Sequence, residues 1–380
     1  MSDHQFVEIR AGGLPCIRFE NLPEGHRRIL ASEFGGEALS PPHPTAKPFV
    51  SVRFGPVLPP SDAAFVGRAS CASRGWLHVQ EGPAWASIPI QLVLEGASEF
   101  VVEASPDYDL IRLIGYVLEP LAKVRALLQG HTFIHSSAVA IGGRAVLLCA
   151  WGNTGKTNLM LKLAEFGATM LSDDWSLLLA DGTIAGYPRP VNLMNYNLDI
   201  FPRLRRQLSW KKKLVYFCDR GFRRLRRRVA WSHPALLRAG DMAERLLELG
   251  ANARLPLGRF EAISGSSLPA GAIVEVHKES PGTGPEVRLM PVVHAARAAA
   301  VCFAYENTRL LQRLAEYAYA FPESDALPGR ILELYRNTLR LNLGKAAGTE
   351  IHSVGIPPRP SMVELNALAV RIQQLVSDAL

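Results

Sequence analysis

The sequence contains no stretch that would place the protein in a membrane or direct it out of the cell. The longest apolar stretch in the middle of the chain, Ala138 to Trp151, is interrupted by Arg144. No run reaches the roughly 18 residues that a transmembrane helix needs. The residues Met1 to His4 include an acid and lack the basic-then-apolar pattern of a secretory signal. We therefore expect a cytoplasmic protein without a transmembrane segment.

Cysteine is scarce and scattered. The 380 residues include five cysteines, and no two of them form a C-x-x-C pair. An odd number at irregular spacing argues against a disulfide framework and against a zinc knuckle. We expect small buried thiols in a reducing compartment at these positions: Cys16, Cys71, Cys149, Cys218 and Cys302.

The composition excludes a disordered or collagen-like chain. Hydrophobic residues make up 48% and charged residues 20% of the sequence, which is ordinary for a folded protein, and we find no internal repeat. Short β-like runs between prolines predict a β-rich accessory region over residues 1–108. Helical spacing dominates residues 301–380. Residues 109–300 between them are expected to form a separate α/β domain.

Positive charge is concentrated in one segment. Residues 203–228, here called the basic segment, contain twelve Lys or Arg and one acid, Asp219. The segment contributes a net charge of +11, so that the rest of the chain carries −4 of the total of +7. Because aromatic residues alternate with the cations, the segment could bind an anionic partner: nucleic acid, an anionic membrane, or an acidic peptide or sugar phosphate. It could also be a solvated helical face.

The middle of the chain predicts the order strand, turn, strand, loop, helix, strand. Two apolar runs flank Gly142-Gly143 and indicate a hairpin, and Asp181-Gly182 indicates a second one. A helix over residues 157–166 is expected to end at Gly167. Further strands are predicted over residues 272–277 and 287–294. Further helices are predicted over residues 107–129, interrupted at Pro120, over residues 234–249, 308–320 and 329–341, and after the capping box of Ser361 and Glu364.

The residues from Ala150 to Thr157 end in Gly-Lys-Thr between an apolar strand and an amphipathic helix. This context is typical of a phosphate-binding loop. The backbone N–H groups and the positive end of the helix would face the phosphates of ATP. Lys156 would reach the β and γ phosphates, and the Thr157 hydroxyl would ligate Mg²⁺. Asparagine accepts a left-handed backbone where glycine is common, so the expected nucleotide-binding residues are Gly152, Asn153, Thr154, Gly155, Lys156 and Thr157.

Two adjacent acids, Asp173 and Asp174, close the strand that follows this helix. We expect this strand and the strand before the loop to be adjacent and parallel, which would bring both carboxylates to the edge where the loop lies. One acid would hold Mg²⁺ directly or through water, and the other would accept a proton from a hydroxyl nucleophile. The alternative is a solvated acid in a turn without a function. This alternative is easier to accept for one of the two aspartates than for both.

His135 lies in the apolar strand that precedes the loop. A lone histidine in such a strand could be a core residue with satisfied hydrogen bonds. It could instead lie beside the aspartates and tune their ionisation. The spacing by itself leaves both interpretations open.

Three motifs together resemble the kinase core of the HPr kinase/phosphorylase family: His135-Ser136-Ser137-Ala138-Val139, the loop that ends in Gly-Lys-Thr, and Leu171-Ser172-Asp173-Asp174. The resemblance covers about residues 110–196. It implies an α/β fold with a P-loop core like that of HPr kinase and phosphoenolpyruvate carboxykinase, flanked here by the β-rich amino-terminal and helical carboxyl-terminal regions. It also implies that residues 109–300 form a kinase domain, with the basic segment as an insertion.

The resemblance further implies phosphoryl transfer from ATP to a hydroxyl. Some members of the family phosphorylate a serine in ribosomal peptide precursors, so a serine in a peptide or protein is the expected acceptor. By motif position, Asp173 would be the catalytic base, Asp174 and Thr157 would hold Mg²⁺, His135 would modulate the base, and Lys156 would bind the phosphates.

The sequence departs from the family after the two aspartates. The Glu-Arg-Gly signature that the family uses for HPr recognition and for the phosphorylase reaction is replaced by residues 186–193, which include Arg189. HPr is therefore not the expected substrate, and reverse phosphorolysis is not implied. Arg189 is a candidate contact to phosphate or substrate, or else a solvated turn residue.

Two other functions stay open. One is a small-molecule kinase or a carboxykinase-like enzyme with a second metal. The other is a nucleotide-binding protein without catalysis, whose basic segment binds nucleic acid or membrane. The capped helix at the carboxyl end would pack on the core or suit a homo-oligomer.

Overall fold

The computed structural model describes residues 6–35, 39–40, 46–67, 69–90, 100–228, 242, 252–260, 262, 266–279, 286–324, 327–346, 350–358 and 360–378. The chain forms a mixed α/β structure with two compact units. Unit 1 contains residues 1–189 and 257–380, and unit 2 contains residues 190–256. The basic segment lies in unit 2, whereas the boundaries expected near residues 108 and 300 stay predictions.

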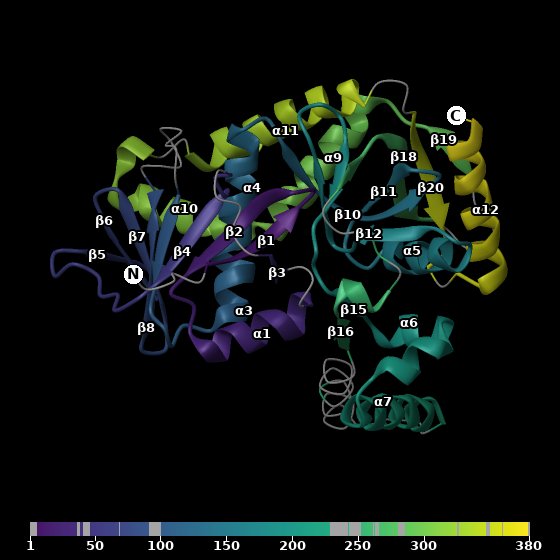
Figure 1. Cartoon of the computed structure of the whole chain (residues 1–380), viewed down its shortest axis with the longest axis horizontal. Coiled ribbons are helices and arrows are strands. Elements are labelled where there is room, and N and C mark those ends of the chain that lie inside the picture. Colours follow the sequence, from purple (N-terminus) through teal and green to yellow (C-terminus); the bar gives the residue numbers. More distant parts are fainter. Residues whose placement is uncertain are drawn as a thin grey trace. The chain divides into compact units, whose positions relative to one another are not determined.

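The amino-terminal part of unit 1 is β-rich, as expected. Its described residues form a nine-stranded sheet with the order β3-β1-β2-β4-β9-β8-β7-β6-β5, drawn in purple and blue in Figure 1. One helix that the sequence analysis did not predict, α1 (Glu24–Phe34), follows β2 and buries Leu30 and Phe34. The strands are β1 (Val7–Ala11), β2 (Leu14–Glu20), β3 (Leu39–Ser40), β4 (Val50–Phe54), β5 (Ala64–Gly67), β6 (Ser70–Ser73), β7 (Trp76–Glu81), β8 (Ala84–Pro89) and β9 (Val101–Ala104).

A second sheet forms the centre of unit 1 and carries the predicted site. Its order is β17-β14-β13-β10-β11-β18-β20-β19, and β12 pairs separately with β10. Both hairpins predicted from glycine-containing turns are confirmed, between β10 and β11 and between β13 and β14. The strands are β10 (Thr132–Ile141), β11 (Arg144–Ala150), β12 (Thr169–Ser172), β13 (Trp175–Leu178), β14 (Ile184–Gly186), β17 (Ser267–Leu268), β18 (Ala270–Lys278), β19 (Val287–Leu289) and β20 (Ile351–Ile356).

The strand that enters the loop and the strand that ends at the aspartates are parallel but not adjacent. β10 lies between them and is antiparallel to both β11 and β12. The expectation of neighbouring parallel strands was therefore wrong. Its consequence still holds, because two strands antiparallel to the same neighbour end at the same edge. The intervening strand also brings His135 and Ser137 to that edge.

Helices cover the central sheet. The helices α4, α9 and α11 contact β10 and form one large core with it, whereas α5 and α12 contact each other and the sheet on its other side (Figure 1). The capping box predicted at Ser361 and Glu364 is confirmed at the start of α12. Among the described residues, the helices of unit 1 other than α1 are α3 (Leu110–Leu113), α4 (Glu119–Leu128), α5 (Lys156–Glu165), α9 (Val292–Glu306), α10 (Thr308–Ala320), α11 (Leu327–Lys345) and α12 (Met362–Asp378), with 3₁₀ turns at Leu257–Arg259 and Pro322–Ser324.

Pro120 does not divide the helix that leads into the central sheet. A π-helical turn, Ile114–Leu118, joins α3 to α4, and Pro120 falls in the first turn of α4. The π-helical turn directly before Pro120 is the kind of irregularity at which a helix accommodates a residue that lacks an N–H donor. The side chain of Asp109 accepts a hydrogen bond from the N–H of Arg112 and caps the start.

Two elements near the site differ from the prediction. The strand expected over residues 287–294 ends at Leu289, and residues 292–306 form α9. Alanine, which is frequent in α9, is the strongest helix former, and Pro291 begins the helix. The carboxyl-terminal part is not purely helical, because β20 inserts between α11 and α12 and pairs with β18. Nearly all of the helix expected over residues 234–249 lies outside the described residues.

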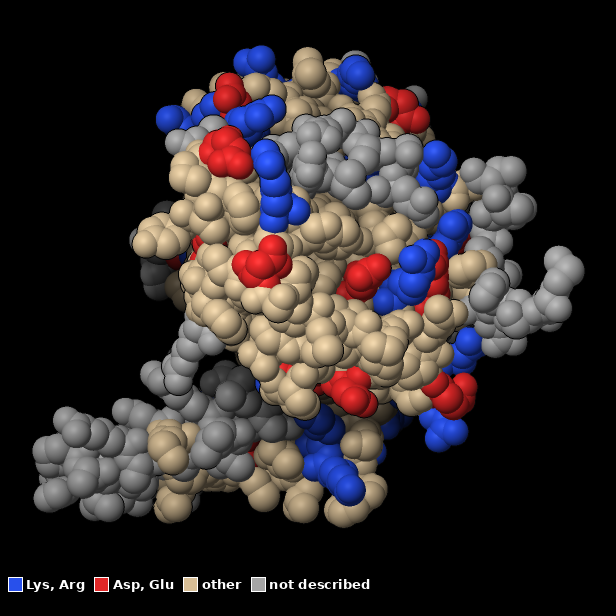
Figure 2. Space-filling view, turned by 90° about the vertical axis from the view of Figure 1, so that its left-hand side faces the viewer, with Lys and Arg blue, Asp and Glu red and all other residues tan. Residues whose placement is uncertain are grey.

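Unit 2 contains α6 (Asn195–Ile200), a 3₁₀ turn (Pro202–Gln207), α7 (Trp210–Arg228) and the antiparallel pair β15 (Val191–Leu193) and β16 (Ala253–Leu255). α7 holds most of the basic segment. In unit 1, by contrast, cations and acids are interspersed on the face that Figure 2 shows, as the small net charge outside the basic segment requires.

Candidate functional site

The loop between β11 and α5 has the backbone that its residues predicted. Asn153 and Gly155 have positive φ angles of 61° and 114°, which asparagine and glycine accept more readily than other residues. The Thr154 hydroxyl donates to the carbonyl of Trp151 at 2.6 Å and closes the turn. α5 begins at Lys156, so that the N–H groups of its first turn lie at the end of the loop.

Lys156 is buried and points to the strand that precedes the loop. Its amine lies 2.9 Å from Nε2 of His135. His135 is therefore not an isolated core residue, and of the two interpretations the position beside the acidic pair is the observed one. Its Nε2 also lies 3.0 Å from Oδ1 of Asp174.

Asp173 is enclosed by hydroxyl groups. It is 2% exposed, and the hydroxyl of Ser137 donates to Oδ1 at 2.5 Å. The hydroxyl of Thr157 lies 3.2 Å from the same oxygen. Burial raises the pKa of Asp173, against the opposing effects of Lys156 and Ser137.

Asp174 has different surroundings. Its side chain is 33% exposed and forms an ion pair with Arg189. Its φ is 74°, a left-handed conformation that aspartate adopts more readily than most residues. Burial by itself would raise its pKa, but Arg189 and His135 together hold the pKa of Asp174 well below its usual range. The carboxylate is therefore ionised at neutral pH.

Arg189 connects the aspartates to the helix α4. Its guanidinium pairs with Glu119 at 2.7 Å as well as with Asp174. The hydroxyl of Tyr187 donates to Glu119 at 3.2 Å. The interpretation of Arg189 as a solvated turn residue was wrong, because the side chain is largely buried in this network. The sequence analysis missed Glu119, whose position beside a proline in a helix gave no sign of a buried acid.

A second cation lies behind the network. Lys123, one turn after Glu119 on α4, is buried with its amine 3.2 Å from the ring centroid of Trp175. The amine also lies 3.5 Å from Oδ1 of Asn307. Burial lowers the pKa of Lys123 to about 7, although the Glu119 carboxylate opposes the shift. No sequence motif pointed to this residue.

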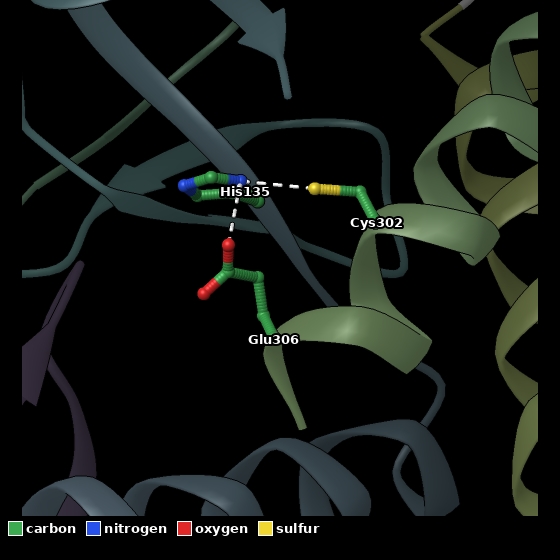
Figure 3. A group of neighbouring side chains, drawn as sticks. All are labelled: His135, Cys302 and Glu306. Carbon is green, nitrogen blue, oxygen red and sulfur yellow. Dashed lines mark hydrogen bonds and ion pairs between the residues drawn. The ribbon is translucent and has the colours of Figure 1, made fainter. Parts of the chain in front are cut away.

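The Nδ1 side of His135 faces the helix α9. Nδ1 lies 3.0 Å from the sulfur of Cys302 and 3.9 Å from Oε1 of Glu306 (Figure 3). Burial raises the pKa of the Cys302 thiol to about 12, so that the thiol is neutral. Cys302 is buried, as expected, and so are Cys16 and Cys71, but its position beside a histidine was not predicted. The expectation of a buried thiol was wrong for Cys218, which is exposed on α7, and Cys149 is only partly buried. Glu306 was missed because the helix that carries it was missed.

The structure thus brings together the loop, His135, both aspartates and Arg189, which the sequence motifs singled out separately. It also shows that Asp173, rather than Asp174, is the acid that the Thr157 hydroxyl contacts. The arrangement offers backbone N–H groups and a lysine for phosphate, hydroxyl and carboxylate oxygens for a hard cation, and an exposed ionised acid.

The comparisons with known proteins give no family for this chain. No protein-family model matches the sequence, and no curated protein matches it. Among the residues that the structure describes, no helix is long and apolar enough to cross a membrane.

Proposed function

We propose that this chain is an ATP- and Mg²⁺-dependent kinase that transfers the γ-phosphoryl group to a hydroxyl, that of a serine in a peptide or protein. One observation supports the proposal above all. Four predicted site residues lie together around His135 and Ser137 at one edge of the central sheet: Lys156, Thr157, Asp173 and Asp174. Phosphoryl transfer needs a phosphate cradle, a hard cation and an acid that orients the hydroxyl. These residues supply candidates for all three.

The residues fit a nucleotide and its metal. The N–H groups around Gly155 and the start of α5 suit a polyphosphate. Mg²⁺ prefers oxygen ligands, and the Thr157 hydroxyl and the Asp173 carboxylate lie together at the end of the loop. Mg²⁺ held there would neutralise charge on the phosphates.

The surroundings of the two aspartates favour exchanging the roles that motif position implies. Asp173 is enclosed and contacts Thr157, which suits a ligand to Mg²⁺ directly or through water. Asp174 is the more accessible of the two acids, with a side chain that is 33% exposed, so that an incoming hydroxyl can approach it more readily than Asp173. A general base has to lie within hydrogen-bond reach of its proton before its pKa matters. We therefore assign the orientation and deprotonation of the acceptor to Asp174, held in place by His135 and Arg189.

Lys156 has to exchange partners during the reaction. Its amine lies 2.9 Å from Nε2 of His135. A lysine at the end of a phosphate-binding loop contacts the β and γ phosphates, so we expect the side chain to turn from His135 to ATP. His135 would then keep Asp174 as its partner on the Nε2 side.

The experiment is incubation of the chain with γ-labelled ATP, Mg²⁺ and a cell extract. Label in a peptide or protein, at serine, is the expected result. The variant Lys156→Ala should abolish it, whereas Lys162→Ala, which removes another buried lysine from the same helix, should not. The absence of any labelled acceptor with wild-type protein would contradict the proposal.

The experiment also separates the other candidate functions. Label in a small metabolite would favour the small-molecule or carboxykinase-like kinase. ATP binding without any transfer would favour a nucleotide-binding protein whose basic segment carries the function.

A further inference from the structure

We propose that His135, Cys302 and Glu306 form a binding site for a divalent transition metal of the Zn²⁺ type, separate from the Mg²⁺ site. The site lies on the Nδ1 side of His135, where α9 faces β10 (Figure 3). Nothing in the proposed phosphoryl transfer uses Cys302 or Glu306. The inference does not depend on the proposed function.

The three side chains converge on one point. Nδ1 of His135 lies 3.0 Å from the Cys302 sulfur and 3.9 Å from Oε1 of Glu306, and the three ligand atoms all lie within 4.8 Å of one another. Tetrahedral zinc bonds imply ligand-to-ligand distances of roughly 3.3–3.7 Å. Small side-chain rotations reach that geometry. Cys302 and Glu306 are one helical turn apart on α9 and therefore share a face.

The ligand types select the metal. Thiolate and imidazole favour Zn²⁺, Co²⁺ and related ions, whereas Mg²⁺ prefers oxygen and keeps its waters. Three protein ligands leave a fourth position for water, as in open zinc sites. A cavity lined by residues that include His135, Cys302, Cys149, Trp151 and Ala299 adjoins the cluster and leaves space beside the thiol.

The hydrogen bonds around His135 indicate which protonation form of its imidazole would bind the metal. Nε2 cannot donate to Asp174 and accept from Lys156 at the same time, although both lie within 3.0 Å. Metal binding uses the Nδ1 lone pair, so that the proton stays on Nε2 and is donated to Asp174. A carboxylate behind a metal-bound histidine is a common supporting contact. The thiol of Cys302 would give its proton to solvent as the metal–sulfur bond forms.

The test is a titration of the metal-free full chain with Co²⁺ in the absence of nucleotide and Mg²⁺. We expect one equivalent to produce a thiolate-to-cobalt charge-transfer band, and Zn²⁺ to displace it. Cys302→Ser should lose the band, and the matched variant Cys149→Ser, from the same cavity, should keep it. A band that persists in Cys302→Ser, or the absence of a band in wild-type protein, would overturn the proposal.

A second variant covers the case in which Cys302→Ser does not fold. The Glu306 side chain is 31% exposed at the end of α9, so Glu306→Gln should fold. Loss of even an indirect contact weakens metal binding roughly 10–100-fold, and we expect Co²⁺ affinity to fall at least roughly tenfold. Unchanged affinity would overturn the site. Because no ATP is present, failure of the kinase proposal would leave this result unaffected.

A separate observation concerns α7 in unit 2. We infer that the outward face of α7 binds the surface of an anionic lipid bilayer. Four large apolar side chains on this helix are 55–70% exposed. They recur at spacings of four, three and eight residues, which places them on one side of a helix: Trp210, Leu214, Phe217 and Leu225.

The opposite face of α7 packs against the rest of unit 2. Tyr216 and Asp219 are buried there, and their side chains bond to Asp199 and Asn195. The apolar stripe therefore points away from these contacts, with cations such as Arg224 beside it. Exposed Trp, Phe and Leu beside Lys and Arg are typical of helices that lie in a membrane interface. Nucleic acid is less suited, because Leu offers no stacking surface for a base.

The test is cosedimentation of the full chain with vesicles of phosphatidylcholine alone or with phosphatidylglycerol. We expect binding only to the anionic vesicles, and weaker binding as salt is added. The variant Leu214→Ser/Leu225→Ser should bind at least roughly tenfold less, since each leucine contributes about 1.5–3 kcal/mol when buried. Leu332→Ser on α11 is the control and should bind normally. Equal binding of the stripe variant, or binding to random DNA but not to vesicles, would overturn the inference.

Discussion

At the residue scale, two neighbouring carboxylates have opposite surroundings. Asp173 is closed in by Ser137 and Thr157, whereas Asp174 is exposed and paired with Arg189 and His135. The backbone at Asp174 is left-handed, with a φ of 74°, and the two side chains have no partner residue in common among these contacts. Two acids that are adjacent in sequence can therefore serve two different tasks.

The first prediction separates these tasks. Asp174→Asn should retain MgATP binding and lower the rate of transfer by roughly 10²–10⁴-fold, the range typical of a lost general base. Asp173→Asn should instead raise the Mg²⁺ concentration needed for half-maximal binding of ATP. The measurements are single-turnover transfer of label and titration with Mg²⁺. If Asp173→Asn kept normal MgATP binding and lost transfer, Asp173 would be the base.

The second prediction concerns the buried ion pair. Arg189→Met should cost roughly 3–5 kcal/mol of the free energy of unfolding, because Glu119 is left buried without its charge partner. The double variant Arg189→Met/Glu119→Gln should recover a large part of this loss. Urea unfolding of the two single variants and the double variant measures the coupling. Additive losses would show that the two charges do not stabilise each other.

At the scale of elements, the site depends on α4 and α9, which pack against β10. α4 supplies Glu119 and Lys123, and α9 supplies Cys302 and Glu306. Each helix carries its polar groups one turn apart and therefore on one face. Those of α4 contact Arg189 and Trp175, and those of α9 contact His135 on β10. The charged and polar side chains on these otherwise buried helix faces therefore help to set the charge distribution around the predicted site.

The third prediction follows from the buried lysine of α4. The pKa of Lys123 is about 7 in the folded chain and lies near 10.5 in the unfolded chain. Below pH 7 both states hold the proton, and the folded state carries the full cost of the buried charge. Between pH 7 and 10.5 the unfolded state holds more protons, so that stability rises with pH.

Lys123→Met should therefore stabilise the protein most at pH 6, and its advantage over wild type should shrink by pH 9. Thermal unfolding across this range is the measurement. Leu127→Met, on the same helix, has no titrating group and should give an offset that does not change with pH. An advantage of Lys123→Met that grew with pH would contradict the burial argument.

At the scale of the whole molecule, the chain leaves unit 1 after residue 189 and returns at residue 257. The two ends of unit 2 are held together, because Val191 pairs with Leu255 in the ladder of β15 and β16. Strands in a ladder lie about 5 Å apart, so a short linker can replace the unit.

The fourth prediction is that unit 1 folds without unit 2. Replacement of residues 190–256 by a short Gly/Ser linker should leave a single cooperative transition within about 5 °C of the original, since loop closure changes the free energy only slowly with length. Differential scanning calorimetry of the shortened and the full chain measures the two transition temperatures. Loss of the transition would show that unit 2 contributes to the core of unit 1. The shortened chain should also lose vesicle binding, because it lacks α7.

How much of this was predictable depends on the range of the interactions. The loop backbone, the two hairpins and the cap of α12 are set by residues within a few positions of one another. The spacing of His135 left two interpretations open, and the resemblance implied the one in which it lies beside the aspartates. Motif position implied that Asp173 is the base and that Asp174 holds Mg²⁺ with Thr157, and these roles stay predictions. The structure shows the Thr157 hydroxyl in contact with Asp173.

The remaining partners come from far along the chain. Cys302 contacts His135 across 167 residues, and Lys123 reaches Asn307 across 184. No spacing rule links such residues, since only the packing of α4 and α9 on β10 places them together. The sequence by itself therefore determined the loop, the turns and the caps, because glycine geometry and local hydrogen bonds act over a few residues. The tertiary structure alone decided that Cys302 and Glu306 lie beside His135, because burial brings together side chains that are distant in the chain.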